Sequence, residues 1–221
     1  MIADWRKALA SYRYPCDFSS YCDRREHPGH FTMRIDGDRE STIAFEDRFR
    51  ELAPISLGAY AEVIFWKMYS QGGRADHRTS VAVANMRKHG ESPAVIWDKV
   101  CGFVRSPSRE NLKRMRSAIG VTSGMLPTAL TFPAFAEPER FPMLDTRVAK
   151  WVNQHWRAAN RETNAQLVPF KLNSTSVRDN DFDSYLHWVR WCREMAGRLS
   201  DSTERHWRAR DVEMAVFAST R

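Results

Sequence analysis

The sequence SRENLKRMRSAIGVTSGMLPTALTFPAFAEPERFPMLDTRV, residues 108–148, decides the fold. Its apolar residues first recur at helical spacing, which predicts a helix over about 108–118. A short turn over 119–125 contains two glycines and leads into a second helix over about 126–135. Pro133 should kink this second helix or end it early. The stretch therefore predicts two helices joined by a glycine-containing hairpin.

Outside this stretch, helical periodicity dominates the chain from residue 43 onward. Before it, residues 13–42 have no helical period, and the weak alternation over 30–35 ends in Asp36-Gly37-Asp38, a turn signal for a small hairpin. We expect an all-α fold whose other helices cover about 2–12, 57–70, 74–89, 92–104, 146–160, 179–199 and 208–219.

The composition bounds the class of protein. The chain has 221 residues, of which 43% are hydrophobic, so it is long enough and apolar enough to form a real core. No apolar run approaches the roughly 18 residues that a membrane span needs, and the charged N-terminus does not resemble a signal peptide. The four cysteines form no C-x-x-C pair, so we expect no metal site. We expect a cytoplasmic monomer that does not bind membranes.

Positive charge points toward a polyanionic partner. The formal net charge is +7, and Arg109, Lys113 and Arg116 recur at helical spacing on one face of the first hairpin helix. For an isolated helix, a solvated basic face would be the simpler interpretation. Because the glycine hairpin follows directly, we expect these three side chains to lie against the backbone of double-stranded DNA.

The hairpin itself is a predicted phosphate site. Backbone N–H groups in a glycine turn point outward, and the helix that follows adds its positive N-terminal end. The expected donors are Gly120, Thr122, Ser123 and Gly124. Such contacts hold a nucleic acid without reading its sequence.

Two segments carry a resemblance to a known family. Ile119-Gly-Val to Thr128-Ala and Phe141-Pro-Met-Leu-Asp-Thr-Arg-Val148 resemble the helix-hairpin-helix superfamily of base-excision DNA glycosylases, which includes endonuclease III and the adenine-mismatch and 8-oxoguanine glycosylases. The specific similarity covers about residues 108–152. A looser similarity begins near residue 57, with Ala61-Glu-Val-Ile-Phe-Trp-Lys67.

The resemblance implies a two-lobed helical architecture with a cleft between the lobes. Residues 1–56 would pack with the C-terminal helices of 161–221 to form one lobe. Residues 57–160 would form the helical domain that carries the helix-hairpin-helix motif at about 108–135. The implied function is removal of a damaged or mispaired base from DNA.

Asp145 is the candidate catalytic carboxylate. In the family, the matching aspartate stabilises positive charge on the sugar while the bond to the base breaks, and such electrostatic stabilisation is physically reasonable. The alternative is that Asp145 only caps the helix that begins after it. Arg147 follows two residues later and is expected to contact DNA.

Two departures from the family pattern limit the chemistry. Bifunctional members carry a nucleophilic lysine where this chain has Pro127, and no lysine lies between 117 and 149. A Schiff-base mechanism through that position is therefore excluded, and a monofunctional hydrolase is implied. The hairpin is also about two residues longer than usual. The resemblance implies no required cofactor, although it allows a monovalent cation at the hairpin.

The helix over 57–70 supplies further candidates. Glu62 matches the glutamate that protonates the departing base in adenine-mismatch enzymes, and its apolar neighbours predict burial and a raised pKa. The alternative is an ion pair with Lys67 or an arginine. Trp66 and Tyr69 are candidate walls of a base pocket, but ordinary core residues are the better interpretation.

Two other functions remain open from the sequence. The first is a glycosylase-like module that binds nucleic acid without catalysis. The second is a domain whose hairpin contacts a protein. Salt-dependent DNA binding without excision of any base would identify the first alternative and not an enzyme.

Overall fold

The computed structural model describes residues 2, 4–15, 37–69, 73–121, 125–172 and 177–220, with the side chains of 73 and 74 left aside. The described chain is predominantly helical, so the all-α prediction is confirmed. The α-helices are α1 (Trp5–Ala10), α3 (Arg39–Leu52), α4 (Leu57–Met68), α5 (Gly73–His89), α6 (Pro93–Arg105), α7 (Arg109–Ala118), α8 (Leu126–Ala129), α9 (Thr131–Ala136), α10 (Thr146–Ala159), α11 (Phe182–Asp201) and α12 (Ala209–Ser219), and a 3₁₀ turn, η2 (Asp179–Asp181), precedes α11.

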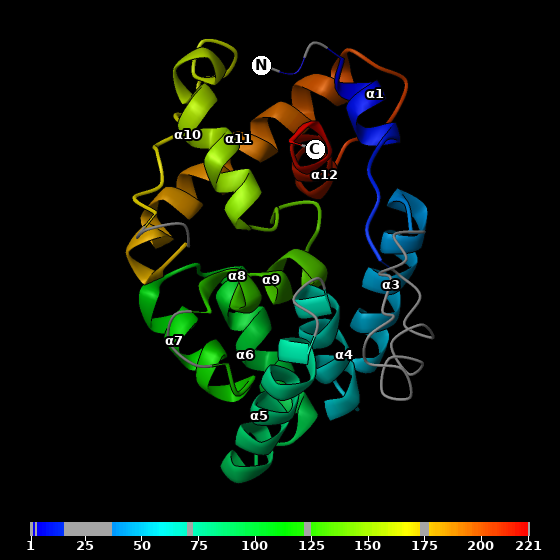
Figure 1. Ribbon diagram of the computed structural model, residues 1–221, viewed down its shortest axis with the longest axis vertical. Coiled ribbons are helices and arrows are strands. Elements are labelled where there is room, and N and C mark those ends of the chain that lie inside the picture. The colour runs from blue at the N-terminus through cyan, green and yellow to red at the C-terminus, as the bar shows by residue number, and fades with distance from the viewer. Residues whose placement is uncertain are drawn as a thin grey trace.

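The helices pack mainly within two groups (Figure 1). In one group α1, α10 and α11 all contact α12, so the first and last helices of the chain lie side by side. In the other group α3 to α9 pack around α4, α6 and α9. The loop after α9 crosses from the second group into the first and ends at the start of α10 (Figure 1).

Aromatic side chains fill much of the core. Trp66, Trp188, Trp191 and Trp207 are all almost completely buried. Trp188 and Trp191 stack with their ring centroids 5.4 Å apart. Large rings of this kind bury much apolar surface each, which explains how a chain with a negative mean hydropathy of −0.56 still folds around a dense core.

The second hairpin helix is broken into two. We expected one helix over about 126–135, but α8 ends at Ala129 and α9 begins at Thr131. Pro133 explains the position of the break, because its ring clashes with the carbonyl four residues earlier, that of Ala129. The proline therefore acts one turn upstream of its own position, and it lies within the first turn of α9.

Most of the small hairpin predicted before α3 cannot be compared with the structure. Residues 16–36, which include most of that hairpin, lie outside the described part of the chain. Gly37 forms an isolated antiparallel bridge with Tyr14, whose N–H donates to the Gly37 carbonyl at 2.8 Å. Asp38 is the N-cap of α3 and accepts from Ser41 N at 3.0 Å. The turn signal therefore includes a helix start.

A buried network of ion pairs joins α3 to α12. Asp211 accepts from Arg39 at 2.8 and 2.9 Å and from the Arg208 guanidinium at 3.0 and 3.2 Å. Glu46 accepts from Arg208 at 2.9 Å and from Arg210 at 3.1 Å. Arg210 also pairs with Glu213. Three cations thus face three anions, and this pairing lowers the free-energy cost of burying the charges.

Within the described residues, no helix is long and apolar enough to pass through a bilayer.

Candidate functional site

The segment before α10 is held by three side chains from distant helices. Tyr185 donates to the Pro142 carbonyl at 3.1 Å and Trp188 Nε1 to the Met143 carbonyl at 3.1 Å. Lys67 Nζ donates to the Leu144 carbonyl at 3.3 Å. Three consecutive carbonyls are therefore anchored, two to α11 and one to α4. The next residue is Asp145.

Asp145 caps α10, as the alternative interpretation of this residue predicts. Its Oδ1 accepts from Val148 N at 2.8 Å, and its side chain remains partly exposed. A carboxylate has a second oxygen, so capping through Oδ1 does not exhaust its capacity to act on a ligand. The anchored segment and the cap together give this carboxylate a defined place where the two helix groups meet.

Lys67 is a functional candidate that the sequence reasoning missed. The side chain is buried, and burial lowers the pKa of Lys67 to about 8, while the negative charge of Asp145 counteracts part of that fall. The electrostatic coupling places this ammonium in the field of the candidate carboxylate. The sequence signal was a lysine inside an almost wholly apolar helix, LGAYAEVIFWKM.

Trp66 and Tyr69 are core residues. Both are completely buried. The Trp66 ring lies 4.4 Å from that of Tyr14 and 5.1 Å from that of Phe135, centroid to centroid. The prediction that these two side chains wall an open base pocket is therefore wrong, and the core interpretation that the sequence favoured is correct.

Glu62 is not buried. Its side chain is 44% exposed and forms an ion pair of 3.0 Å with Arg48 of α3. The apolar neighbours that predicted burial lie on the other faces of α4, because residue 62 falls on the side that faces α3 and solvent. The predicted burial is wrong, and the alternative of pairing with an arginine is what the structure has.

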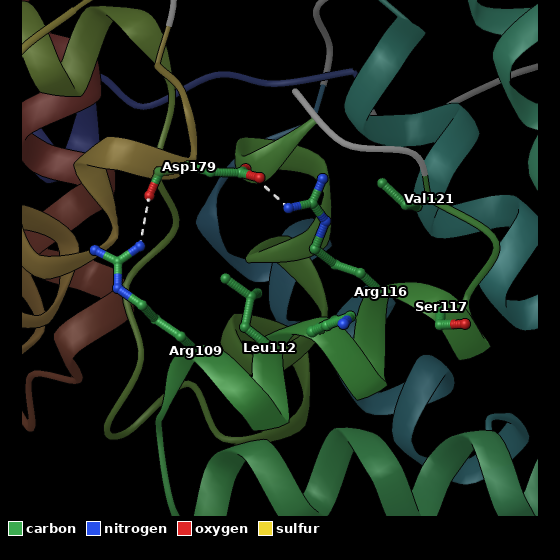
Figure 2. Close-up of a pocket in the computed structure, with 7 residues that line it drawn as sticks. Arg109, Leu112, Arg116, Ser117, Val121 and Asp179 are labelled. Atoms are coloured by element: carbon green, nitrogen blue, oxygen red, sulfur yellow. Dashed lines mark hydrogen bonds and ion pairs between the residues drawn. The ribbon is translucent and has the colours of Figure 1, made fainter.

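The basic face of α7 lines a cavity of about 370 Å³ (Figure 2). Lys113 and Arg109 are exposed there, but Arg116 is only 8% exposed. Arg116 donates to the Asp179 carboxylate at 2.8 Å, and Arg109 to the Asp179 carbonyl at 3.3 Å. Figure 2 shows both guanidinium groups turned toward Asp179.

Ion pairing weakens this face as a docking site for phosphate. Arg109 also pairs with Asp183 at 2.7 Å, so two carboxylates offset part of the charge of the three cations. The pair with Asp183 is exposed at both ends and can exchange for a phosphate at little cost. Arg116, by contrast, is nearly buried and paired with Asp179, so neither the predicted contact with the DNA backbone nor the alternative of a solvated basic face fits its position.

Gly120 ends α7 rather than presenting its N–H to a ligand. Its φ is +67°, and its N–H donates to the Ser117 carbonyl at 3.2 Å while that of Val121 donates to the Arg116 carbonyl at 3.1 Å. These two bonds define a Schellman motif, which satisfies the last carbonyls of a helix. Because its N–H is used, the predicted role of Gly120 as a phosphate donor is wrong.

The remaining predicted donors, Thr122, Ser123 and Gly124, lie outside the described residues, as does the place of the monovalent cation expected at the hairpin. Arg147 is exposed at the start of α10, with its guanidinium 5.1 Å from the ring centroid of Phe217 in α12.

Comparison with protein-family models, with curated proteins and with solved structures finds no match to this chain.

Proposed function

We propose that the protein is a monofunctional DNA glycosylase that hydrolyses the bond between a damaged or mispaired base and its sugar. The observation that carries the proposal is Asp145: a partly exposed carboxylate that follows three anchored carbonyls and lies where the two helix groups meet. Preorganised negative charge of this kind stabilises an oxocarbenium-like transition state.

In this mechanism the exposed side chains of Arg109, Lys113 and Arg147 hold the DNA backbone while the target nucleotide leaves the base stack. Flipping costs a few kcal/mol and is cheapest for a damaged or mispaired base. The bond to the base then breaks, and the base leaves with the electron pair while the Asp145 oxygen that does not cap α10 stabilises the sugar cation and orients water. The water adds to the sugar, and the proton that it loses passes through solvent to the base. The base-protonating role that the resemblance implied for Glu62 is dropped from the proposal, since its carboxylate is exposed and paired with Arg48.

The test is an incision assay with Asp145→Asn. Duplexes carrying 8-oxoguanine, uracil, alkylated adenine or mismatched adenine are incubated with protein and then treated with alkali. Alkali-dependent breaks with the wild type, absent with Asp145→Asn and without a borohydride-trapped adduct, are the expected result.

A matched control separates chemistry from capping. Asp38 caps α3 through the same i to i+3 bond, and Asn caps helices about as well as Asp. Asp38→Asn should retain activity. Equal loss in both variants, or no breaks with any duplex, would contradict the proposal.

The second candidate is a nucleic-acid-binding module without catalysis. The capping bond from Val148 N to Asp145 favours it, because that bond gives Asp145 a structural role that needs no catalysis. Salt-dependent DNA binding with no excision of any base would select this candidate.

A further inference from the structure

We propose that an open groove between α1, α10 and the end of α12 is a second binding surface for the DNA backbone, on the opposite helix group from α7. The identification of the ligand as DNA rests on the proposed function, whereas the groove and its charge do not. It has a volume of about 760 Å³, twice that of the cavity at α7. Its cations are Lys7, Arg147 and Lys150.

The helix pattern produces this basic wall. In α10 the residues Val148, Ala149, Trp151 and Val152 are buried, which turns Arg147 and Lys150 outward. In α1, Leu9 is buried and Lys7 is exposed. Because α1 and α10 both pack on α12, cations that are about 140 positions apart in the sequence line one groove.

The positive charge of the groove is not neutralised as it is at α7. Among the described residues, none of Lys7, Arg147 and Lys150 forms an ion pair. Arg147 instead lies over the Phe217 ring, an arrangement that keeps its charge. Asp4 is the carboxylate in the groove, and its Oδ1 is engaged by Lys7 N at the start of α1. Three cations against one anion favour a polyanion.

Asp145 and two of the groove cations lie within the first two turns of α10. Lys150 lies five residues after Asp145 on α10, which corresponds to about 7.5 Å along the helix axis. That is roughly two base steps of 3.4 Å along one strand. A duplex bound in the groove therefore lies against the first turns of α10, close along the chain to Asp145.

The experiment measures how DNA affinity depends on salt. Binding of a short undamaged duplex is followed by fluorescence anisotropy at several NaCl concentrations. Each phosphate contact contributes about 0.9 to the slope of log K against log salt. Lys7→Ala/Lys150→Ala should therefore lower the slope by nearly two. Arg87→Ala/Lys88→Ala, which removes two exposed cations from α5, should leave it unchanged.

Several results would overturn the proposal that the groove binds the DNA backbone. They are an unchanged slope in Lys7→Ala/Lys150→Ala, an equal fall in the α5 control, or no DNA binding at low salt. Displacement of the duplex by sodium phosphate but not by NaCl of equal ionic strength would indicate a small-anion site and would also overturn it. A groove-dependent slope in a protein that excises no base would reject the glycosylase and retain the groove.

Discussion

Lys67 Nζ donates to the carbonyl of Leu144, at 3.3 Å, and so joins α4 to the residue that precedes Asp145. The two residues are 77 positions apart in the chain. The bond ties the helix that bears the Ala61-Glu-Val-Ile-Phe-Trp-Lys67 resemblance to the Phe-Pro-Met-Leu-Asp segment. Lys67 is therefore a positioning residue for the candidate carboxylate, acting through backbone geometry and through its charge.

Lys67→Met should lower kcat for excision at least tenfold, because the carbonyl that precedes Asp145 loses its anchor to α4 and the carboxylate is no longer held in place. Its effect on the free energy of unfolding should stay within about 2 kcal/mol, since removing a buried charge offsets the lost hydrogen bond. Single-turnover rates and urea denaturation measure the two effects.

The pH profile separates this role from a merely structural one. Since the pKa of Lys67 is lowered to about 8, the ammonium is lost as pH rises through that value. Loss of the positive charge weakens the hydrogen bond to the Leu144 carbonyl, so the wild-type excision rate should fall above about pH 8. Lys67→Met should lack this fall. Identical profiles would contradict the assignment.

Tyr185→Phe tests the anchored carbonyls without changing charge. It removes the hydrogen bond to the Pro142 carbonyl at a buried site, which should cost about 1 to 3 kcal/mol of unfolding free energy. Thermal and urea unfolding give the value. Because Lys67 and Asp145 are untouched, excision should fall less than in Lys67→Met. A greater fall would mean that the anchor at Pro142 places Asp145 more than the anchor at Leu144 does.

Gly120→Ala should destabilise the protein by about 3 kcal/mol or more. A Cβ at this position would lie 2.2 Å from the Ala82 carbonyl oxygen of α5, in addition to the cost of a positive φ. Gly90→Ala is the matched control, because Gly90 has φ +66° but open space around it. It should cost only about 1 to 2 kcal/mol. Equal losses in the two variants would show that the close approach to α5 is not important.

The helices could be predicted from the sequence because their signals are local. Ser56, Ser92 and Ser108 each cap the helix that begins after them, and apolar periodicity gives the rest. The break between α8 and α9 has a local cause too, because the Pro133 ring clashes with the carbonyl four residues earlier.

The site was less predictable because its contacts are long-range. The exposure of Glu62 depends on where α3 packs, and the neutralisation of Arg116 depends on Asp179, which is 63 residues away. The prediction for Gly120 is wrong for a different reason. A glycine after a helix is as much a C-terminal signal as a phosphate signal, and only the hydrogen bonds distinguish the two.

The buried ion pairs between α3 and α12 predict a specific response to acid. Arg39 and Arg208, through hydrogen bonds and charge, more than offset burial and lower the pKa of Asp211 to about 2, from 3.8. A carboxylate whose pKa is lower in the folded state stabilises that state above its unfolded pKa, and the stabilisation is lost as pH falls from about 4 toward 2. For one such group this amounts to about 2 kcal/mol.

Asp211→Asn isolates that contribution, because the amide resembles the protonated acid and does not titrate. The variant should be less stable than the wild type at pH 6, and the difference should shrink by about 2 kcal/mol between pH 5 and pH 2.5. Urea denaturation at a series of pH values measures it, with Asp183→Asn, an exposed pair of Arg109, as the control that should show little change. A difference that stays constant with pH would mean that the three-cation, three-anion network does not hold Asp211 in its charged form.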